Sequence, residues 1–208
     1  MPTSTDSNST PEATSGTPTT MGNTPTSTAD AIVIAAKKFN VDANALRTSV
    51  CYHESAHAAV ALHYGCTVRE IQLTAVPGSL AGTEIVQGLG GKGIFVQMTA
   101  GPLCDRQRNN HYQFPESFLM EFERGEKRSF ERELLRKLPK FNSAHVDALW
   151  QSYTNDARGI LALPRIQAFL DALAARIMAA LDAGERTVTG SEIMVLWNQH
   201  GVDGESAR

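Results

Sequence analysis

The sequence predicts an α+β fold that is mostly α-helical and carries a small β-hairpin or sheet. Between residues 29 and 199 most segments repeat apolar residues at helical spacing. Two short segments, 66–76 and 83–86, have the composition and spacing of strands. Pro77-Gly78-Ser79 lies between them and is a turn signal, so we expect the two strands to pair as a hairpin.

The chain of 208 residues divides by composition into one domain and two tails. Residues 1–28 are almost entirely small and polar, with no aromatic residue, and cannot bury enough apolar surface to offset the entropy of ordering. We therefore predict a disordered Thr/Ser/Pro-rich tail over 1–28, a folded domain over 29–200 and a flexible C-terminus over 201–208.

Helix ends are marked by capping residues and glycines. Asp30 is a candidate cap for a short helix that runs through Phe39, and Asp42 for a longer one from Ala43 to Tyr64 that stops at Gly65. Residues 88–93 are expected to form a glycine-rich loop, which is followed by a helix over 94–108.

The second half of the chain is predicted to be helical throughout. Residues 115–138 predict one or two amphipathic helices with a break at Gly125, whose charge-rich face we expect to be solvated. Further helices are expected over 143–162, 165–183 and 190–199. Thr189 and Glu192 fit a capping box for the last of these.

Charge and hydropathy exclude several classes of protein. A net charge of −3 gives no reason to expect nucleic acid as a partner, and no apolar run reaches the roughly 20 residues that cross a bilayer. No basic stretch followed by an apolar one marks a secretory signal. The scattered cysteines Cys51, Cys66 and Cys104 indicate reduced thiols and a cytoplasmic location.

The residues that carry chemistry are His53-Glu54-Ser55-Ala56-His57, an HExxH pattern within a helical segment. Residues i and i+4 lie one turn apart on the same helix face, so two imidazoles can reach one zinc ion at about 2.0–2.1 Å. Glu54 is then placed beside a zinc-bound water and can act as its general base. The sequence therefore predicts His53 and His57 as metal ligands and Glu54 as the catalytic residue.

The third ligand stays open at this point. His63 has the outer spacing of a longer zinc motif, but on a continuous helix it lies about 240° around the axis from His57, which favours a non-ligand. Asp156 is the main acidic candidate, although a carboxylate at an expected helix N-terminus can equally be a cap. Glu70 and Glu84 occupy strand positions that we expect to face solvent.

Several blocks of the sequence, in order, resemble the peptidase domain of the FtsH-type ATP-dependent zinc metalloproteases. The resemblance covers roughly residues 45–199. The blocks that carry it are His53–Ala58, which is similar to that family's HEAGHA, Leu80–Thr83, Ala100–Asp105, Thr154-Asn155-Asp156 and Thr187–Ile193. The resemblance implies a zinc peptidase fold and makes Asp156 the expected third ligand of Zn²⁺.

The sequence departs from that family in its domain content. No ATPase or membrane segment accompanies the peptidase-like region, and Gly88–Gly93 lacks the spacing of a P-loop. The stretch between Asp105 and Asp156 is longer than the family's equivalent, so the resemblance implies a helical insertion over about 110–150. This insertion can be a lid, a docking surface or, as its charge-rich sequence favours, a plain solvated face. The expected activity is hydrolysis of peptide bonds in peptides or unfolded proteins, with a separate ATPase as a partner where unfolding is needed. The alternative is a non-catalytic, peptidase-like module that keeps a metal site and binds or regulates partners.

Overall fold

The computed structural model describes residues 27–74, 80–86 and 91–200, and within this part the fold is mostly helical with one small sheet, as predicted. Residues 1–26 of the predicted N-terminal tail, the predicted C-terminal tail and the Pro77-Gly78-Ser79 turn lie outside the described residues, whereas Ser27 and Thr28, assigned to the tail, belong to the folded part. The elements in chain order are α1 (Thr28–Phe39), α2 (Ala43–His63), β1 (Thr67–Gln72), β2 (Gly82–Val86), α3 (Gly91–Tyr112), α4 (Glu116–Lys137), α5 (Ser143–Leu161), α6 (Pro164–Ala183), β3 (Thr187–Thr189) and α7 (Gly190–Gln199).

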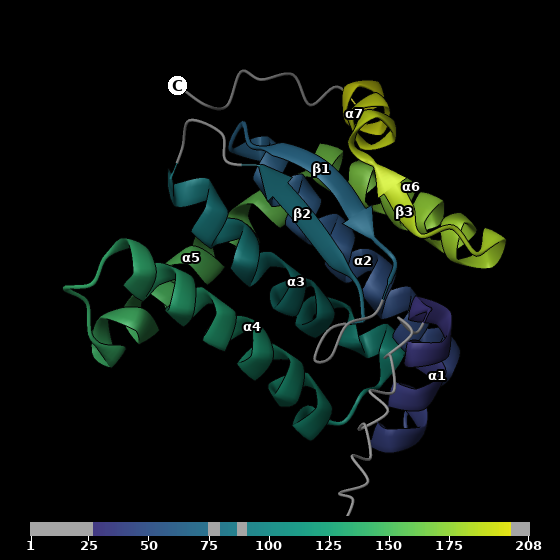
Figure 1. The fold of residues 1–208 in the computed structure, drawn as a ribbon, viewed down its shortest axis with the longest axis horizontal. Coiled ribbons are helices and arrows are strands. Elements are labelled where there is room, and N and C mark those ends of the chain that lie inside the picture. The colour runs from purple at the N-terminus through teal and green to yellow at the C-terminus, as the bar shows by residue number, and fades with distance from the viewer. Residues whose placement is uncertain (1–26, 75–79, 87–90, 201–208) are drawn as a thin grey trace, which may run out of the picture.

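Helix α2 forms the centre of the molecule. It packs more extensively on α3 than on any other element, and next on α6, while β1 and β2 lie across it (Figure 1). Every residue from 53 to 62 is buried. Because alanines fill much of this stretch, the neighbouring helices can approach the α2 backbone closely.

The sheet has the strand order β2-β1-β3, and both pairings are antiparallel. The predicted pairing of the first two strands is confirmed, with Val68 opposite Ile85 and Ile71 opposite Thr83. The third strand, β3, was not predicted, because three residues are too few to show alternation in the sequence. In this sheet β2 is paired on one side only.

The ends of α2, α5, α6 and α7 were predicted to within one residue, whereas the start of α1 and both ends of α3 were not. Asp42 caps α2, and the capping box of Thr189 with Glu192 begins α7. The predicted cap Asp30 is wrong: Ser27 caps α1, and its hydroxyl oxygen accepts from the Asp30 backbone N–H at 3.1 Å. Helix α1 therefore starts three residues earlier than expected, at the buried Thr28, whose hydroxyl donates to the Leu80 carbonyl.

The glycine-based expectations also need correction. Helix α3 already begins at Gly91, so the predicted loop does not extend to Gly93. Helix α4 runs unbroken through Gly125, where we expected a break. A glycine inside an exposed helix costs only about 1 kcal/mol, and the apolar residues on both sides of Gly125 outweigh that cost by packing on the core.

Helix α4 joins two hydrophobic clusters. Phe118 and Leu119 belong to the main core around α2, whereas Phe130 and Leu134 belong to a smaller cluster under α5. The middle of α4, around Glu126, lies between these two anchored ends. None of the described helices has the length and apolar character needed to cross a membrane.

Candidate metal centre

The polar face of α2 is buried against α3. His53, Glu54 and His57 are only 8%, 5% and 6% exposed. Burying three ionisable side chains in an apolar core is costly unless each has partners. The partners that the structure provides show how the three groups are oriented.

His53 is held by a carboxylate on α3. Its Nδ1 lies 2.7 Å from Oδ2 of Asp105, which is itself buried. The other oxygen of Asp105 accepts from the Ser49 hydroxyl at 2.7 Å. An ionised Asp105 can only accept, so the proton sits on Nδ1 of His53 and the Nε2 atom points away from this pair.

His57 is held in the same way by a backbone carbonyl. Its Nδ1 lies 2.7 Å from the carbonyl oxygen of Gln97 on α3. A carbonyl has no proton to give, so Nδ1 of His57 is the donor, and Nε2 is the nitrogen left to face a ligand. Carbonyl and carboxylate partners on the far nitrogen are the arrangement by which proteins orient metal-binding histidines.

The charge of Asp105 also changes the proton affinity of His53. Burial by itself lowers the pKa of this imidazole, but the attraction of Asp105 and the hydrogen bond to it outweigh burial and raise the pKa to about 10. In the metal-free protein, His53 therefore carries a second proton at neutral pH. A metal ion that binds Nε2 has to displace that proton.

The two imidazoles converge on one point of α3. Their ring centroids are 4.7 Å apart, with the ring planes at 74°. Both Nε2 atoms lie against Gly101, where α3 has no side chain. The two imidazoles therefore lie on the same face of α2, as the HExxH spacing predicted, with their Nε2 atoms on the same side of the helix.

A third potential ligand comes from α4. Oε1 of Glu126 lies 4.0 Å from Nε2 of His53. In the described part of the chain, His53, His57 and Glu126 form a group whose donor atoms all lie within 4.8 Å of one another. The Glu126 side chain is 34% exposed, so it lies at the rim while the two rings lie in the interior.

Glu54 is oriented toward the sheet. Its Oε2 accepts from the hydroxyl of Thr83 on β2 at 2.7 Å, and the same hydroxyl lies 3.2 Å from the Glu54 carbonyl. The predicted general base is thus fixed by the strand that forms one edge of the sheet. The site draws on α2, α3, α4 and β2.

Asp156 is not part of the group that includes the two histidines. It lies in the C-terminal half of α5, not at a helix N-terminus as expected, because α5 begins at Ser143 with Asn142 as its cap. Its Oδ2 pairs with Nζ of Lys92 at 2.9 Å. It lines a surface hollow together with His63 and Tyr64, so both of the distant candidates from the sequence gather there.

The cysteines are separate from this chemistry. All three are free and buried. Burial raises the pKa of Cys51 and of Cys104 to about 12, so both stay neutral thiols at physiological pH. They pack as small apolar residues, in agreement with the prediction of reduced thiols.

Three residues at the site, Glu126, Asp105 and Thr83, were not identified as candidates from the sequence. For Glu126 the sequence does contain an indication. Phe118, Phe122, Glu126, Phe130 and Leu134 recur at every fourth position of α4, and Glu126 is the single charge in that apolar series. Asp105 follows the buried run that ends at Cys104, which is a weaker signal of the same kind. Thr83 had none, because a strand threonine is common.

Comparison of the chain with protein-family models, with curated proteins and with solved structures finds no match.

Proposed function

We propose that this chain is a zinc-dependent peptidase in which His53, His57 and Glu126 hold the metal ion and Glu54 is the general base. The observation that carries the proposal is the convergence of two oriented imidazoles and one carboxylate beside a second, separately held carboxylate. Two nitrogen donors and one oxygen donor leave a fourth position for water, which is typical of catalytic zinc sites.

The donor set fits a zinc ion after a small closing movement. Donors bonded to tetrahedral zinc at about 2.0–2.1 Å are about 3.4 Å apart. The donor atoms here are within 4.8 Å of one another, and the His53–Glu126 pair is at 4.0 Å. Glu126 is the partly exposed member, so rotation of its side chain can supply most of the difference.

Asp156, the ligand implied by the resemblance, is the weaker candidate on geometry. It is engaged by Lys92 on α3, and it would have to leave that ion pair to approach the histidines. Glu126 needs no such exchange of partners. We therefore assign the third position to Glu126 and treat Asp156 as the alternative that the ligand variants distinguish.

When bound, zinc supplies an activated water and polarises the substrate carbonyl. The chain's own groups supply the rest of the chemistry. Glu54 takes the proton of the attacking water and passes it to the leaving amine. Thr83 holds one oxygen of Glu54, and Asp105 and Gln97 hold the rings of the two histidines so that their Nε2 atoms stay directed at one point.

A peptide is the substrate class that fits the surroundings. Strand β2 is paired with β1 on one side only in the described sheet, and its Thr83 touches Glu54. An extended peptide can add to such an edge through backbone hydrogen bonds, which would bring a peptide bond beside the base. A folded protein cannot do this, so the expected substrates are peptides or unfolded chains, with a partner ATPase for folded ones.

The test is zinc content measured together with hydrolysis of a quenched fluorescent peptide or of casein. Tag-free wild type should bind one zinc ion per chain and hydrolyse the substrate. Glu54→Gln should bind zinc equally well and lose at least about 100-fold in rate, since general bases contribute about 10²–10⁴. Equal hydrolysis by the Glu54→Gln protein would remove Glu54 from the mechanism.

The burial of the site favours a second candidate, the non-catalytic module. Both histidines and Glu54 are under a tenth exposed, so little of their surface is open to a substrate. In that case the metal would stabilise the packing of α4 on α2 and α3. Zinc binding that raises the melting temperature, without hydrolysis of any of a panel of peptides, would select this candidate over the peptidase.

A further inference from the structure

We propose that Gly101 is the residue that makes room for the metal ion between α2 and α3, so that a side chain at this position excludes the ion without removing any ligand. This inference rests on the proposed metal site, but not on the proposed hydrolysis.

The atoms that face Gly101 across the helix interface belong to the rings of His53 and His57. A Cβ atom built on Gly101 would lie 2.5 Å from Nε2 of His57 and closer still to Nε2 of His53. Real Cβ atoms keep van der Waals distance from their neighbours, so the rings would have to move by about 1 Å. The missing side chain therefore leaves open the space beside the two nitrogens that a shared ion needs.

The rings are not free to move aside. Nδ1 of His53 is tied to buried Asp105, and Nδ1 of His57 is tied to the Gln97 carbonyl. Displacing either ring from α3 lengthens or bends one of these hydrogen bonds. A methyl group at position 101 and an ion bonded to both Nε2 atoms consequently compete for the same space.

The glycine has no better explanation in the local backbone. Gly101 lies in the interior of α3, where glycine is less favourable than alanine by roughly 0.5–1 kcal/mol. Pro102 follows it, and the proline lacks the N–H that would bond to the Met98 carbonyl. Two successive residues that weaken a helix thus lie where α3 meets the histidines, which agrees with a site that needs close approach more than helix stability.

The chain offers a matched control. Gly159 lies inside α5, and a Cβ atom there would meet nothing within 4 Å. Gly159→Ala and Gly101→Ala are the same chemical change in a helix interior. They differ in whether the added methyl faces the two imidazoles.

The experiment is zinc titration against a competing chelator, with thermal unfolding in the presence and absence of zinc, for wild type and both alanine variants. Gly159→Ala should bind zinc as wild type does. Gly101→Ala should lose at least about 100-fold in zinc affinity, as does loss of a ligand-orienting contact at the upper end of its range. It should also lose the zinc-dependent rise in melting temperature. Zinc affinity of Gly101→Ala within about threefold of wild type would overturn the proposal.

If Gly101→Ala does not fold, a crystal structure of zinc-loaded wild type decides. The ion should be bonded to Nε2 of His53 and of His57 and lie on the Gly101 side of the rings. An ion bound elsewhere, for example at Asp156, overturns the proposal. Zinc bound at this place without peptide hydrolysis would instead refute the peptidase and leave the role of Gly101 intact.

Discussion

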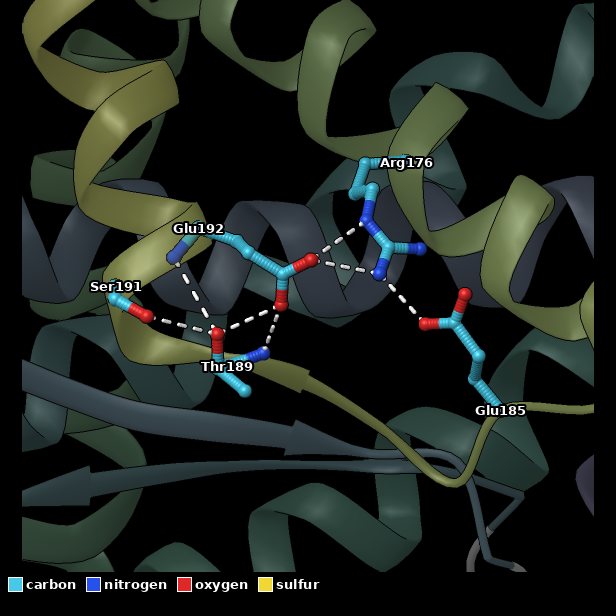
Figure 2. A network of polar contacts seen from close by, with 5 residues as sticks. All are labelled: Arg176, Glu185, Thr189, Ser191 and Glu192. Atoms are coloured by element: carbon cyan, nitrogen blue, oxygen red, sulfur yellow. Dashed lines mark hydrogen bonds and ion pairs between the residues drawn. The ribbon is translucent and has the colours of Figure 1, made fainter.

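The proposed metal centre and the C-terminal junction of α6, β3 and α7 contain the same kinds of polar contact, but the two regions differ in what these contacts do. Figure 2 shows the junction: Glu192 accepts from the Thr189 hydroxyl and backbone N–H at 2.7 and 2.8 Å, while its other oxygen accepts from Arg176 at 2.7 Å. Arg176 also pairs with Glu185 at 2.6 Å. At the proposed metal centre a threonine likewise holds a glutamate, Thr83 with Glu54, and a charged partner holds His53 in place of a carboxylate.

A glycine lies at both places, and the difference between the two glycines is informative. A Cβ atom on Gly190 would collide with the backbone oxygens of Val68 and Arg69, so this glycine lets the start of α7 approach β1. A Cβ atom on Gly101 would collide with two imidazole nitrogens. At the junction the glycine lets backbones meet, whereas at the centre it lets functional groups meet.

Burial separates the two regions further. The side chains of Arg176 and Glu192 are 26% and 38% exposed, so solvent screens their attraction. His53 and Asp105 are both under a tenth exposed. Charges that stay at the surface can simply stabilise a junction, but charges kept in a core at a desolvation cost call for a further use. The use we propose here is the orientation of two imidazole nitrogens toward a metal ion.

The largest effect that would test this contrast is on metal affinity. Glu126→Gln replaces a charged ligand with a weak neutral one, so zinc affinity should fall by about 100-fold or more, equal to about 2.7 kcal/mol. Asp156→Asn should leave affinity within about threefold of wild type, because Asp156 pairs with Lys92. Chelator competition measures both. The reverse order of effects would return the third position to Asp156.

A smaller loss is expected at Asp105. Asp105→Asn keeps the size of the side chain but removes the charge that holds Nδ1 of His53, so zinc affinity should fall by about 10–100-fold. The free energy of unfolding of the metal-free protein should fall by about 1–3 kcal/mol, since a buried charged pair is broken. Arg176→Ala at the exposed junction is the matched control, and it should leave zinc affinity unchanged. Unchanged zinc affinity in Asp105→Asn would show that the pair only fills the core.

The sequence predicted those features of the two regions that depend on residues close together in the chain. The capping box of α7 and the HExxH spacing are local, and both agree with the structure. Asp105, Glu126 and Thr83 reach the centre from separate elements, and their approach depends on how α3, α4 and β2 pack on α2. The residues next to these three in the chain do not indicate how the elements pack. The one exception is Glu126, which is a charged residue in an otherwise apolar series.

The same limit explains why the sequence did not point to Glu126. The sequence offered Asp156, but α5 places that carboxylate in an ion pair with Lys92, and it is not in the group that includes the two imidazoles. The motifs and their order along the chain could indicate that a carboxylate is the third ligand. Only the packing of α4 between two hydrophobic clusters brings a different carboxylate to the histidines.

The contact between Thr83 and Glu54 allows a narrower test, on rate alone. Thr83→Val removes the hydroxyl that orients Glu54 while it preserves the shape of the strand residue. If the peptidase proposal holds, the hydrolysis rate should fall by about 10-fold, part of the general-base contribution, with zinc affinity unchanged. Thr83→Ser retains the hydroxyl and should keep most of the rate. An equal loss in both variants would point to strand packing rather than to the hydrogen bond.

The smallest effect belongs to the junction, and its pH dependence can be worked out. Hydrogen bonds from Thr189 and the charge of Arg176 lower the pKa of Glu192 from 4.5 to about 2. A carboxyl group whose pKa is lower in the folded state stabilises the fold fully above pH 4.5, and this contribution is lost as the pH falls toward 2. Glu192→Gln keeps an acceptor for the Thr189 N–H but has no charge, so at pH 7 it should cost about 0.2–1 kcal/mol. Urea unfolding of wild type and Glu192→Gln should give a difference that shrinks toward zero between pH 4.5 and 2. Zinc affinity should be the same in both proteins, because no residue of the junction belongs to the proposed metal site. If the difference in unfolding free energy between wild type and Glu192→Gln stayed constant with pH, the charge of the Glu192 carboxylate would contribute nothing to stability.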